Sequence, residues 1–148
     1  MKLSTKGRYG LKAMFQLSIL YGDGPIPLKL IAEKQNIPDQ YLEQLVAALR
    51  KEGFVKSVRG AQGGYMLALP PEKITVGDII RTLEGPVAPS ECVIDDDTSS
   101  CNRKDCCITR SVWERIRDSI NNVVDSISLQ DMLNDYNNLE NKDDYNIY

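Results

Sequence analysis

Apolar positions between residues 38 and 53 recur with the spacing of one helical face. Pro38 suits the start of this helix and Gly53 its end. The apolar face comprises Tyr41, Leu42, Leu45, Val46 and Leu49, and the opposite face carries Gln40, Glu43, Gln44, Ala47 and Lys51. We therefore predict a helix that packs by one face and leaves the other free to bind a ligand.

A basic hairpin with a glycine-rich tip is predicted to follow. Residues 54–59 have the composition of a strand, residues 60–64 contain three glycines, and residues 65–67 form the returning strand. Lys56 and Arg59 make the first strand basic. A helix followed by such a hairpin is typical of a winged helix-turn-helix, in which the helix enters the major groove of DNA and the hairpin contacts its backbone or minor groove.

Two further helices are predicted before this unit. Ser4 or Thr5 can cap a helix that runs to about Leu20, and a shorter helix spans residues 28–35 after a break rich in glycine and proline. The beginning of the chain thus follows the order helix, helix, helix, hairpin, which is the order of a winged helix-turn-helix.

The next segments are a capped helix and a loop. Thr75 and Asp78 have the pattern of a capping box. The helix that they open completes a predicted DNA-binding domain over residues 1–86. Residues 87–107 lack periodicity and form a predicted cysteine-bearing loop. A loop of this length in a small protein usually serves a ligand or cofactor.

A long helix with one apolar stripe is predicted after the loop. It begins near Ile108, and the stripe comprises Val112, Ile116, Ile120, Val123 and Ile127. Such a stripe is suited to pairing with its copy in a second subunit, and the alternative is that it covers the core of its own domain. We predict residues 108–136 as a dimerisation helix with a short docking helix, and residues 137–148 as a disordered acidic tail.

Charge is distributed unevenly along the chain. The net charge is −3, but residues 1–66 contain ten Lys and Arg against five Asp and Glu, a charge of +5. Arg8 and its basic neighbours lie at the start of the first helix, where a helix N-terminus already favours phosphate. A basic first half is typical of nucleic-acid binding, although solvated surfaces also produce such splits. No run of about 18 apolar residues and no signal segment is present, so we expect a cytoplasmic protein without membrane contact.

Four cysteines lie within sixteen residues, and they are Cys92, Cys101, Cys106 and Cys107. Clustered thiols in a cytoplasmic protein are more often metal ligands or redox groups than structural disulfides. The chain has no histidine, which excludes ligand sets that contain one. We consider four interpretations of these cysteines: a [2Fe–2S] cluster held by three thiolates and a fourth donor, a thiol redox switch, a zinc site, and cysteines without a function.

Several stretches resemble the IscR/CymR/NsrR family of bacterial winged-helix repressors. They are STKGRYGL at residues 4–11, YLEQL at 41–45, VRGAQGGY at 58–65 and GDII at 77–80. Through residue 90 the chain is most similar to the cysteine-metabolism branch, CymR, whereas the cysteine loop resembles the iron–sulfur branch, IscR. The resemblance extends to about residue 136 and implies a homodimer, joined by the long helix, that binds double-stranded DNA at a pseudo-palindromic site.

The resemblance places base contacts on Glu43 and the adjoining helix face, and a minor-groove contact on Arg59. The chemistry agrees, because a carboxylate accepts from a cytosine amino group and arginine suits a narrow minor groove. The alternative for Glu43 is a solvated pair with Arg50 or Lys51. The predicted DNA-binding residues are Arg8, Gln40, Glu43, Gln44, Lys56, Ser57, Arg59, Gly60 and Gly63.

The resemblance to the IscR branch implies a [2Fe–2S] cluster in the loop. The predicted ligands are Cys92, Cys101 and Cys107, with Cys106 as an alternate. The histidine ligand of that branch corresponds to Arg110 and the aspartate ligand of the NsrR branch to Arg8, and neither arginine can bind iron. The fourth ligand stays open, and the candidates are Cys106, Glu91, Asp105 and a residue of the partner subunit.

The sequence therefore predicts a mainly α, winged helix-turn-helix regulator, a repressor, that senses iron–sulfur or redox status. The alternative is a cysteine-metabolism repressor controlled by the binding of cysteine synthase. An enzyme is not expected, because the chain has no histidine to activate a cysteine and no phosphate-binding glycine loop. One departure from the family is Pro38, at a position where a capping serine is frequent, so the recognition helix lacks a side-chain cap.

Overall fold

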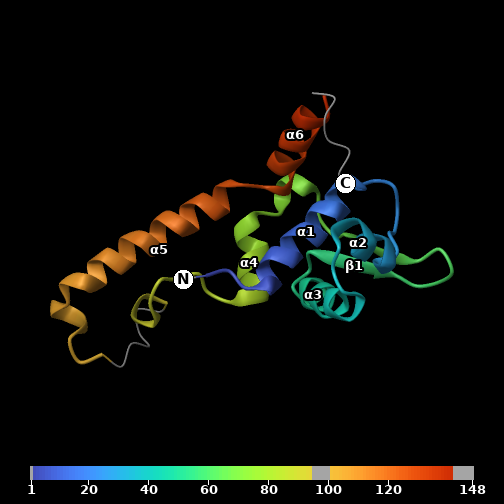
Figure 1. The fold of residues 1–148 in the computed structure, drawn as a ribbon. Helices are drawn as coiled ribbons and strands as arrows, with labels where there is room; N and C mark the ends of the chain where they lie inside the picture. Colours follow the sequence, from blue (N-terminus) through green and yellow to red (C-terminus); the bar gives the residue numbers. More distant parts are fainter. Residues whose placement is uncertain (1, 95–100, 142–148) are drawn as a thin grey trace.

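The computed structural model of the chain describes residues 2–94 and 101–141. Three helices open the fold, and they are α1 (Thr5–Ile19), α2 (Leu28–Gln35) and α3 (Asp39–Lys51). All three pack against one another (Figure 1). Their positions confirm the predicted order of helices, since each begins and ends close to the signals found in the sequence.

The predicted hairpin is also present. Strand β1 (Val55–Val58) pairs antiparallel with β2 (Gly64–Leu67). A pairing that the sequence did not predict lies beside the hairpin, where Ile26 and Tyr65 exchange two backbone hydrogen bonds of 2.8 Å. Prolines flank Ile26 on both sides and have no N–H to donate, so this pairing stays one residue long. The hairpin is thereby attached to the segment that precedes α2.

Helix α4 (Val76–Glu84) follows a short 3-10 turn, η1 (Pro71–Lys73), and packs against α1 and α3. The predicted capping box is confirmed. The side chain of Asp78 accepts from the N–H of Thr75 at 2.9 Å, and the hydroxyl of Thr75 accepts from the N–H of Asp78 at 3.1 Å. Winged helix-turn-helix architecture and a mainly α content are therefore both confirmed.

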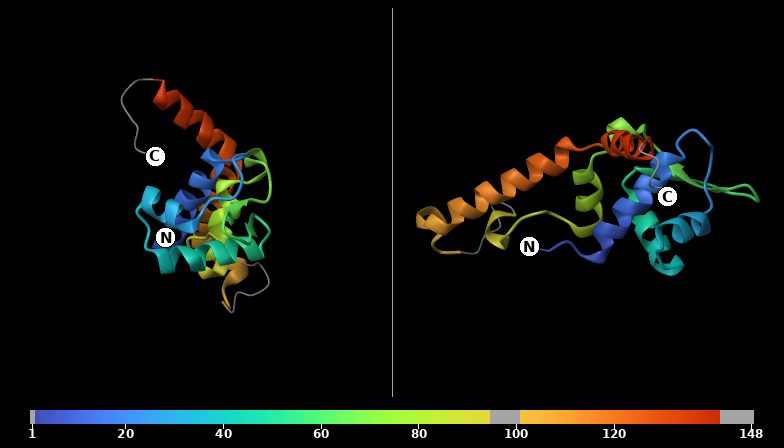
Figure 2. Two further views of the ribbon diagram at one scale, coloured as in Figure 1. Left: turned by 90° about the vertical axis from the view of Figure 1, so that its right-hand side faces the viewer. Right: turned by 45° about the horizontal axis from the view of Figure 1, so that its top comes forward.

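The predicted loop contains two short 3-10 turns in its described parts, η2 (Glu91–Val93) and η3 (Lys104–Cys106). Helix α5 (Ile108–Ser126) then extends away from the rest of the fold (Figures 1 and 2). Of its 19 residues only Arg110 is buried. The apolar stripe therefore does not fill the core of its own domain.

Helix α6 (Leu129–Glu140) packs against α1, where the ring of Tyr136 meets that of Phe15 edge to face with centroids 5.7 Å apart. A capping box of Ser128 and Asp131 opens this helix. The disordered tail predicted from residue 137 is wrong for residues 137–140, which continue the helix. A hydrogen bond from Tyr136 to Glu140, one turn later, supports this extension. The part of the tail at residues 142–148 lies outside the described residues.

The hydrophobic core lies where α1, α2, α3, α4, α6 and the hairpin meet. Its largest fully buried side chains include Met14, Ile31, Leu42, Leu49, Ile74, Ile79 and Leu129. This core fixes the orientation of α3 relative to the hairpin. No helix within the described residues combines the length and the apolar run that crossing a membrane requires.

Candidate nucleic-acid interface and cysteine pocket

Helix α3 presents the predicted polar face to solvent. Its buried residues are Leu42, Leu45, Val46 and Leu49, and its exposed ones include Gln40, Glu43 and Gln44. No side chain caps the helix, as Pro38 led us to expect. Within the described parts of the chain no ion pair joins Glu43 to Arg50 or Lys51. The three polar side chains of α3 are free to contact a ligand.

The hairpin carries the other predicted contacts beside this face. Lys56, Ser57 and Arg59 are all exposed. Ser57, however, is engaged within the protein, since its hydroxyl accepts a hydrogen bond of 3.2 Å from Nη1 of Arg50 at the end of α3. Arg50 was given no DNA-binding role from the sequence, although a basic residue in the last turn of a helix is a frequent partner for nearby acceptors. This bond joins the recognition helix to the hairpin.

The tip of the hairpin depends on two of the predicted glycines. Gly60 has φ +116°, a conformation that side chains strongly disfavour. A Cβ at Gly63 would collide with the carbonyl oxygen of Val58 across the turn. The turn itself therefore requires both glycines, in addition to the close approach to DNA phosphate that the sequence suggested.

Arg8 is exposed on the first turns of α1, but the N-terminus of that helix already holds an anion. The carboxylate of Glu84, at the end of α4, accepts hydrogen bonds from the N–H of Ser4 at 2.6 Å and of Gly7 at 3.2 Å, and from the hydroxyl of Ser4. The expectation that these N–H groups bind phosphate is therefore wrong, because an internal carboxylate occupies them. The basic side chains of α1, rather than its N-terminus, remain available for DNA.

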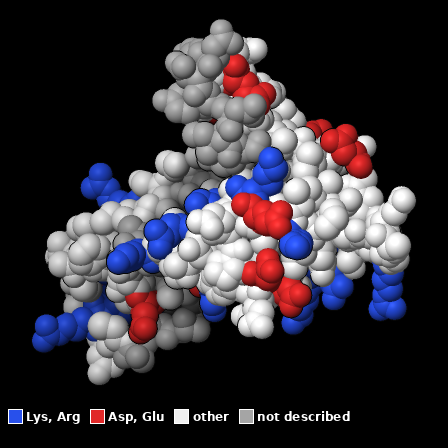
Figure 3. Space-filling model, turned by 45° about the vertical axis from the view of Figure 1, so that its right-hand side comes forward, with Lys and Arg blue, Asp and Glu red and all other residues white. Residues whose placement is uncertain are grey.

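The first turn of α1 lies beside the recognition helix. The hydroxyl of Thr5 is 2.9 Å from the hydroxyl of Tyr41, and the rings of Tyr9 and Tyr41 meet edge to face. Figure 3 shows basic and acidic side chains interspersed over one face of the molecule, with Lys and Arg projecting from its lower edge. An exposed polar helix face, a basic hairpin and adjoining basic side chains on one scaffold define a winged helix-turn-helix DNA-binding protein.

Three of the four cysteines line one small cavity. Cys92, Cys101 and Cys107 border a space of about 20 Å³, together with Lys104 and Arg110. These thiols are the three that the sequence predicted as ligands. The fourth, Cys106, is exposed and its thiol lies 3.7 Å from the carbonyl oxygen of Arg103. It does not border the cavity.

The thiol of Cys107 has a lowered pKa. A hydrogen bond with the hydroxyl of Thr109, 3.2 Å away, lowers the pKa of Cys107, and the backbone N–H of Arg110 lowers this pKa further. A lowered pKa raises the thiolate fraction at neutral pH, and the thiolate is the form that binds metals and attacks electrophiles. Cys92 also borders the cavity, and its sulfur lies 3.3 Å from the hydroxyl of Ser90.

The residues around the cavity fit an iron–sulfur cluster in their chemistry but not in the present spacing, because a space of about 20 Å³ holds about one water molecule and the thiols would have to move apart. Three thiols on one cavity, with cationic side chains beside them, suit a group that binds thiolates and carries negative charge. The two other lining residues, Lys104 and Arg110, cannot bind iron, so the described part of the lining offers no fourth ligand. In the described residues no three Cys, Asp or Glu groups converge closely enough to hold a single metal ion.

Comparison with known proteins identifies the class of regulator. The family model Rrf2, described as "Iron-dependent Transcriptional regulator", matches residues 3–135. The HTH-type transcriptional regulator CymR of Bacillus subtilis is 49% identical over 132 residues, which cover 89% of both chains. The chain therefore belongs to the Rrf2 family and is a transcriptional regulator. Its relatives are named as regulators and not as enzymes, in agreement with the sequence analysis.

Two solved structures share this fold. The structure of T. potens IscR is 53% identical, with a TM-score of 0.74, and the match covers 92% of this chain and 88% of that one. The structure of B. subtilis CymR, described as the global cysteine regulator, is 48% identical, with a TM-score of 0.72 and coverage of 89% and 95%. The chain is thus related to both branches that the sequence resembled.

Proposed function

We propose that the protein is a homodimeric repressor that binds a pseudo-palindromic DNA site. The support for a dimer is the apolar stripe of α5, which leaves Val112 and Val123 46% and 57% exposed. An open groove of about 350 Å³ runs along the same helix and is lined by Val112, Arg115, Ile116, Ser119 and Ile120. A second copy of α5 has the matching apolar stripe to cover it, because a two-fold interface joins identical surfaces.

Each protomer then offers one α3 and one hairpin to half of the site. Glu43, Gln40 and Gln44 would contact base edges in the major groove, and Arg59 would enter the minor groove. Arg8, Lys56 and the glycine tip at Gly60 and Gly63 would hold the phosphate backbone and set the register. As a regulator of bacterial genes, the protein would act in the cytoplasm.

The cysteine loop is the proposed sensor, and a [2Fe–2S] cluster is its proposed cofactor. The single observation that carries this proposal is the cavity shared by Cys92, Cys101 and Cys107. A bound cluster would supply sensitivity to iron supply and to oxidants. The three thiolates would hold it, Lys104 and Arg110 would offset its negative charge, and a fourth ligand would come from outside the cavity lining.

Iron and acid-labile sulfide content of protein purified without oxygen tests the sensor. We expect about two irons and two sulfides per chain, with visible absorbance. Cys92→Ser should lose both, while the matched variant Cys106→Ser, which changes the thiol outside the cavity, should retain them. Equal loss in both variants would contradict the assignment of ligands, and colourless protein after anaerobic reconstitution would contradict the cluster.

A second candidate is a cysteine-metabolism repressor controlled by cysteine synthase. The observation that favours it is the 49% identity to B. subtilis CymR. In that case cysteine synthase should co-elute with the protein and change its affinity for DNA, and cysteine-to-serine variants should behave like the unmodified chain. In the cluster-sensing case, removal of the cluster should change DNA affinity and added cysteine synthase should not.

A further inference from the structure

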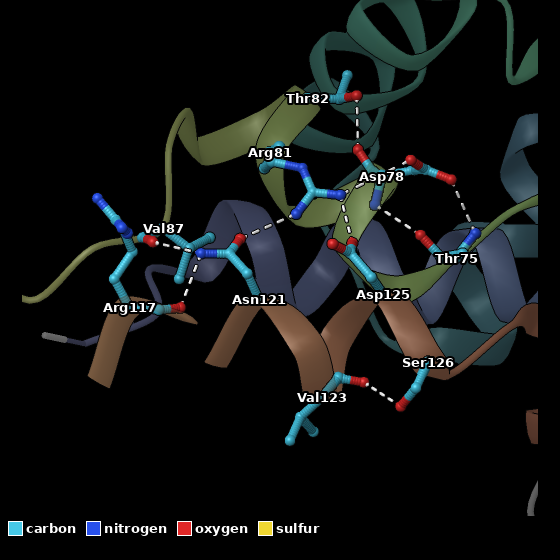
Figure 4. A network of polar contacts seen from close by, with 10 residues as sticks. All are labelled: Thr75, Asp78, Arg81, Thr82, Val87, Arg117, Asn121, Val123, Asp125 and Ser126. Carbon is cyan, nitrogen blue, oxygen red and sulfur yellow. Dashed lines mark hydrogen bonds and ion pairs between the residues drawn. The ribbon is translucent and has the colours of Figure 1, made fainter. Parts of the chain in front are cut away.

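Arg81 of α4 connects the DNA-binding domain to α5. Its guanidinium forms an ion pair with the carboxylate of Asp125, and its Nη1 donates to Oδ1 of Asn121 at 3.0 Å (Figure 4). Asp78, one turn earlier on α4, lies 3.9 Å from the same guanidinium. The Arg81 guanidinium thus binds two residues of α5 that lie one turn apart, Asn121 and Asp125, and so restrains both the tilt and the rotation of that helix.

The cysteine-bearing segment is attached to the same surface of α5. The Asn121 amide, whose oxygen accepts from Arg81, donates to the carbonyl oxygen of Val87 at 3.1 Å. One turn earlier, Nη1 of Arg117 donates to the carbonyl oxygen of Val93 at 2.9 Å. Val93 is fully buried and follows Cys92 directly. A movement of this segment would therefore displace Asn121, to which Arg81 is hydrogen-bonded.

The two helices approach closely where the network lies. A Cβ at Gly77 of α4 would collide with the Asp125 carboxylate, so the absence of a side chain there lets Asp125 reach Arg81. A backbone contact holds the C-terminal end of α5 beside this network, since the N–H of Val76 donates to the carbonyl oxygen of Ile127 at 2.8 Å. The junction thus consists of a backbone hydrogen bond at Ile127 and a side-chain network at Asp125 and Asn121, two and six residues earlier.

The orientation of α5 has a large effect at its opposite end. Nineteen residues span about 28 Å, so a rotation of about 10° at the junction displaces the start of α5 by about 5 Å. This exceeds the rise of one DNA base pair, about 3.4 Å, and the two recognition helices of a dimer must match half-sites at a fixed separation. Small changes at the junction therefore change which spacing the dimer fits.

We propose that Arg81 is a positioning residue that fixes the orientation of α5 relative to the DNA-binding domain and so sets the half-site spacing that the dimer selects. This inference rests on the proposed function, because it requires a dimer on a two-fold site. Arg81 contacts no DNA in this proposal. Its effect is on spacing preference rather than on the affinity of each half-site contact.

The test compares sites that differ only in spacing. The unmodified protein first selects its preferred site from random duplex DNA. Affinity is then measured for that site, for versions with one base pair inserted or deleted at the centre, and for an isolated half-site. We expect the unmodified protein to lose roughly tenfold or more on either change, because the recognition helices no longer reach both half-sites.

Arg81→Ala should discriminate among the three spacings by less than about threefold, with unchanged affinity for the half-site. Gly77→Ala should behave similarly, since it displaces Asp125 without removing a charge and adds helix propensity to α4. Lys29→Ala, which removes an exposed ion pair with Glu33 within α2, is the matched control and should keep the original preference.

Two results would overturn the proposal. Arg81→Ala with the spacing preference of the unmodified protein would show that other contacts set the orientation. Equal loss of affinity on all spacings and on the half-site, with a lower unfolding temperature, would show a purely structural role. If instead the unmodified protein sediments as a monomer or selects no two-fold site, the proposed function itself fails, and this inference fails with it.

Discussion

The exposed stripe of α5 gives a quantitative prediction for the dimer. Val112 and Val123 are 46% and 57% exposed in the single chain. Full burial of a valine side chain contributes about 1.5 kcal/mol, so burying the exposed half yields about 0.8 kcal/mol for each. Two-fold symmetry counts each residue twice, which gives about 3 kcal/mol for the dimer. Val112→Ser with Val123→Ser should therefore weaken dimerisation by about two orders of magnitude in Kd.

Sedimentation equilibrium over a range of concentrations measures this shift directly. The two valines are surface residues of the single chain, so its unfolding temperature should change little. Leu30→Ser is the matched control, because Leu30 is 37% exposed on α2, away from the stripe. The assignment of α5 as the interface would be refuted if the dimer Kd were unchanged in the double variant, or if Leu30→Ser raised it by the same factor.

Three further predictions concern the DNA interface, the anchor of α1 and the cysteine pocket. Arg59→Ala should weaken binding to the selected site by about 1–3 kcal/mol. Lys56→Ala should instead weaken binding to all sequences alike and reduce the slope of log affinity against log salt concentration by about one. Filter binding at several salt concentrations separates the two effects, and full affinity of Arg59→Ala would exclude the minor-groove role. Glu84→Gln should lower the unfolding temperature by roughly 3 °C in calorimetry, since a neutral amide replaces the charge at the helix N-terminus, and an unchanged midpoint would contradict the anchor. In metal-free protein, the alkylation rate of Cys107 should rise with pH at a midpoint below that of an ordinary thiol, because its pKa is lowered. Thr109→Val should move this midpoint upward. A midpoint that Thr109→Val leaves unchanged would show that the Thr109 hydroxyl does not lower the pKa of Cys107.

Local patterns in the sequence predicted the elements of the fold well. The buried face of α3 follows from the spacing of its leucines, and the capping box at Thr75 follows from the hydroxyl and acid three residues apart. The end of α6 was missed because its polar last turn resembles a disordered tail in composition. The pairing of Ile26 with Tyr65 was missed because a single residue between two prolines has no strand pattern.

For the candidate site, too, the sequence predicted some of the residues and not others. The exposed side chains of α3 and the hairpin could be found from the sequence, since helical and strand periods determine which residues share a face. The roles of Glu84 and Arg81 could not, because each contacts a residue at least 40 positions away along the chain. Arg110 was predicted only as a non-ligand, and its place beside three thiols emerged from the fold.

By itself, then, the sequence determined the type of DNA-binding unit, the location of the thiols and the polar face of the reading helix, because periodicity, capping and composition act over a few residues. Only the tertiary structure decided that an internal carboxylate occupies the N-terminus of α1, that three of four cysteines share a cavity, and that Arg81 joins α4 to α5. These contacts depend on how helices pack, and packing is fixed by the whole core rather than by any local pattern.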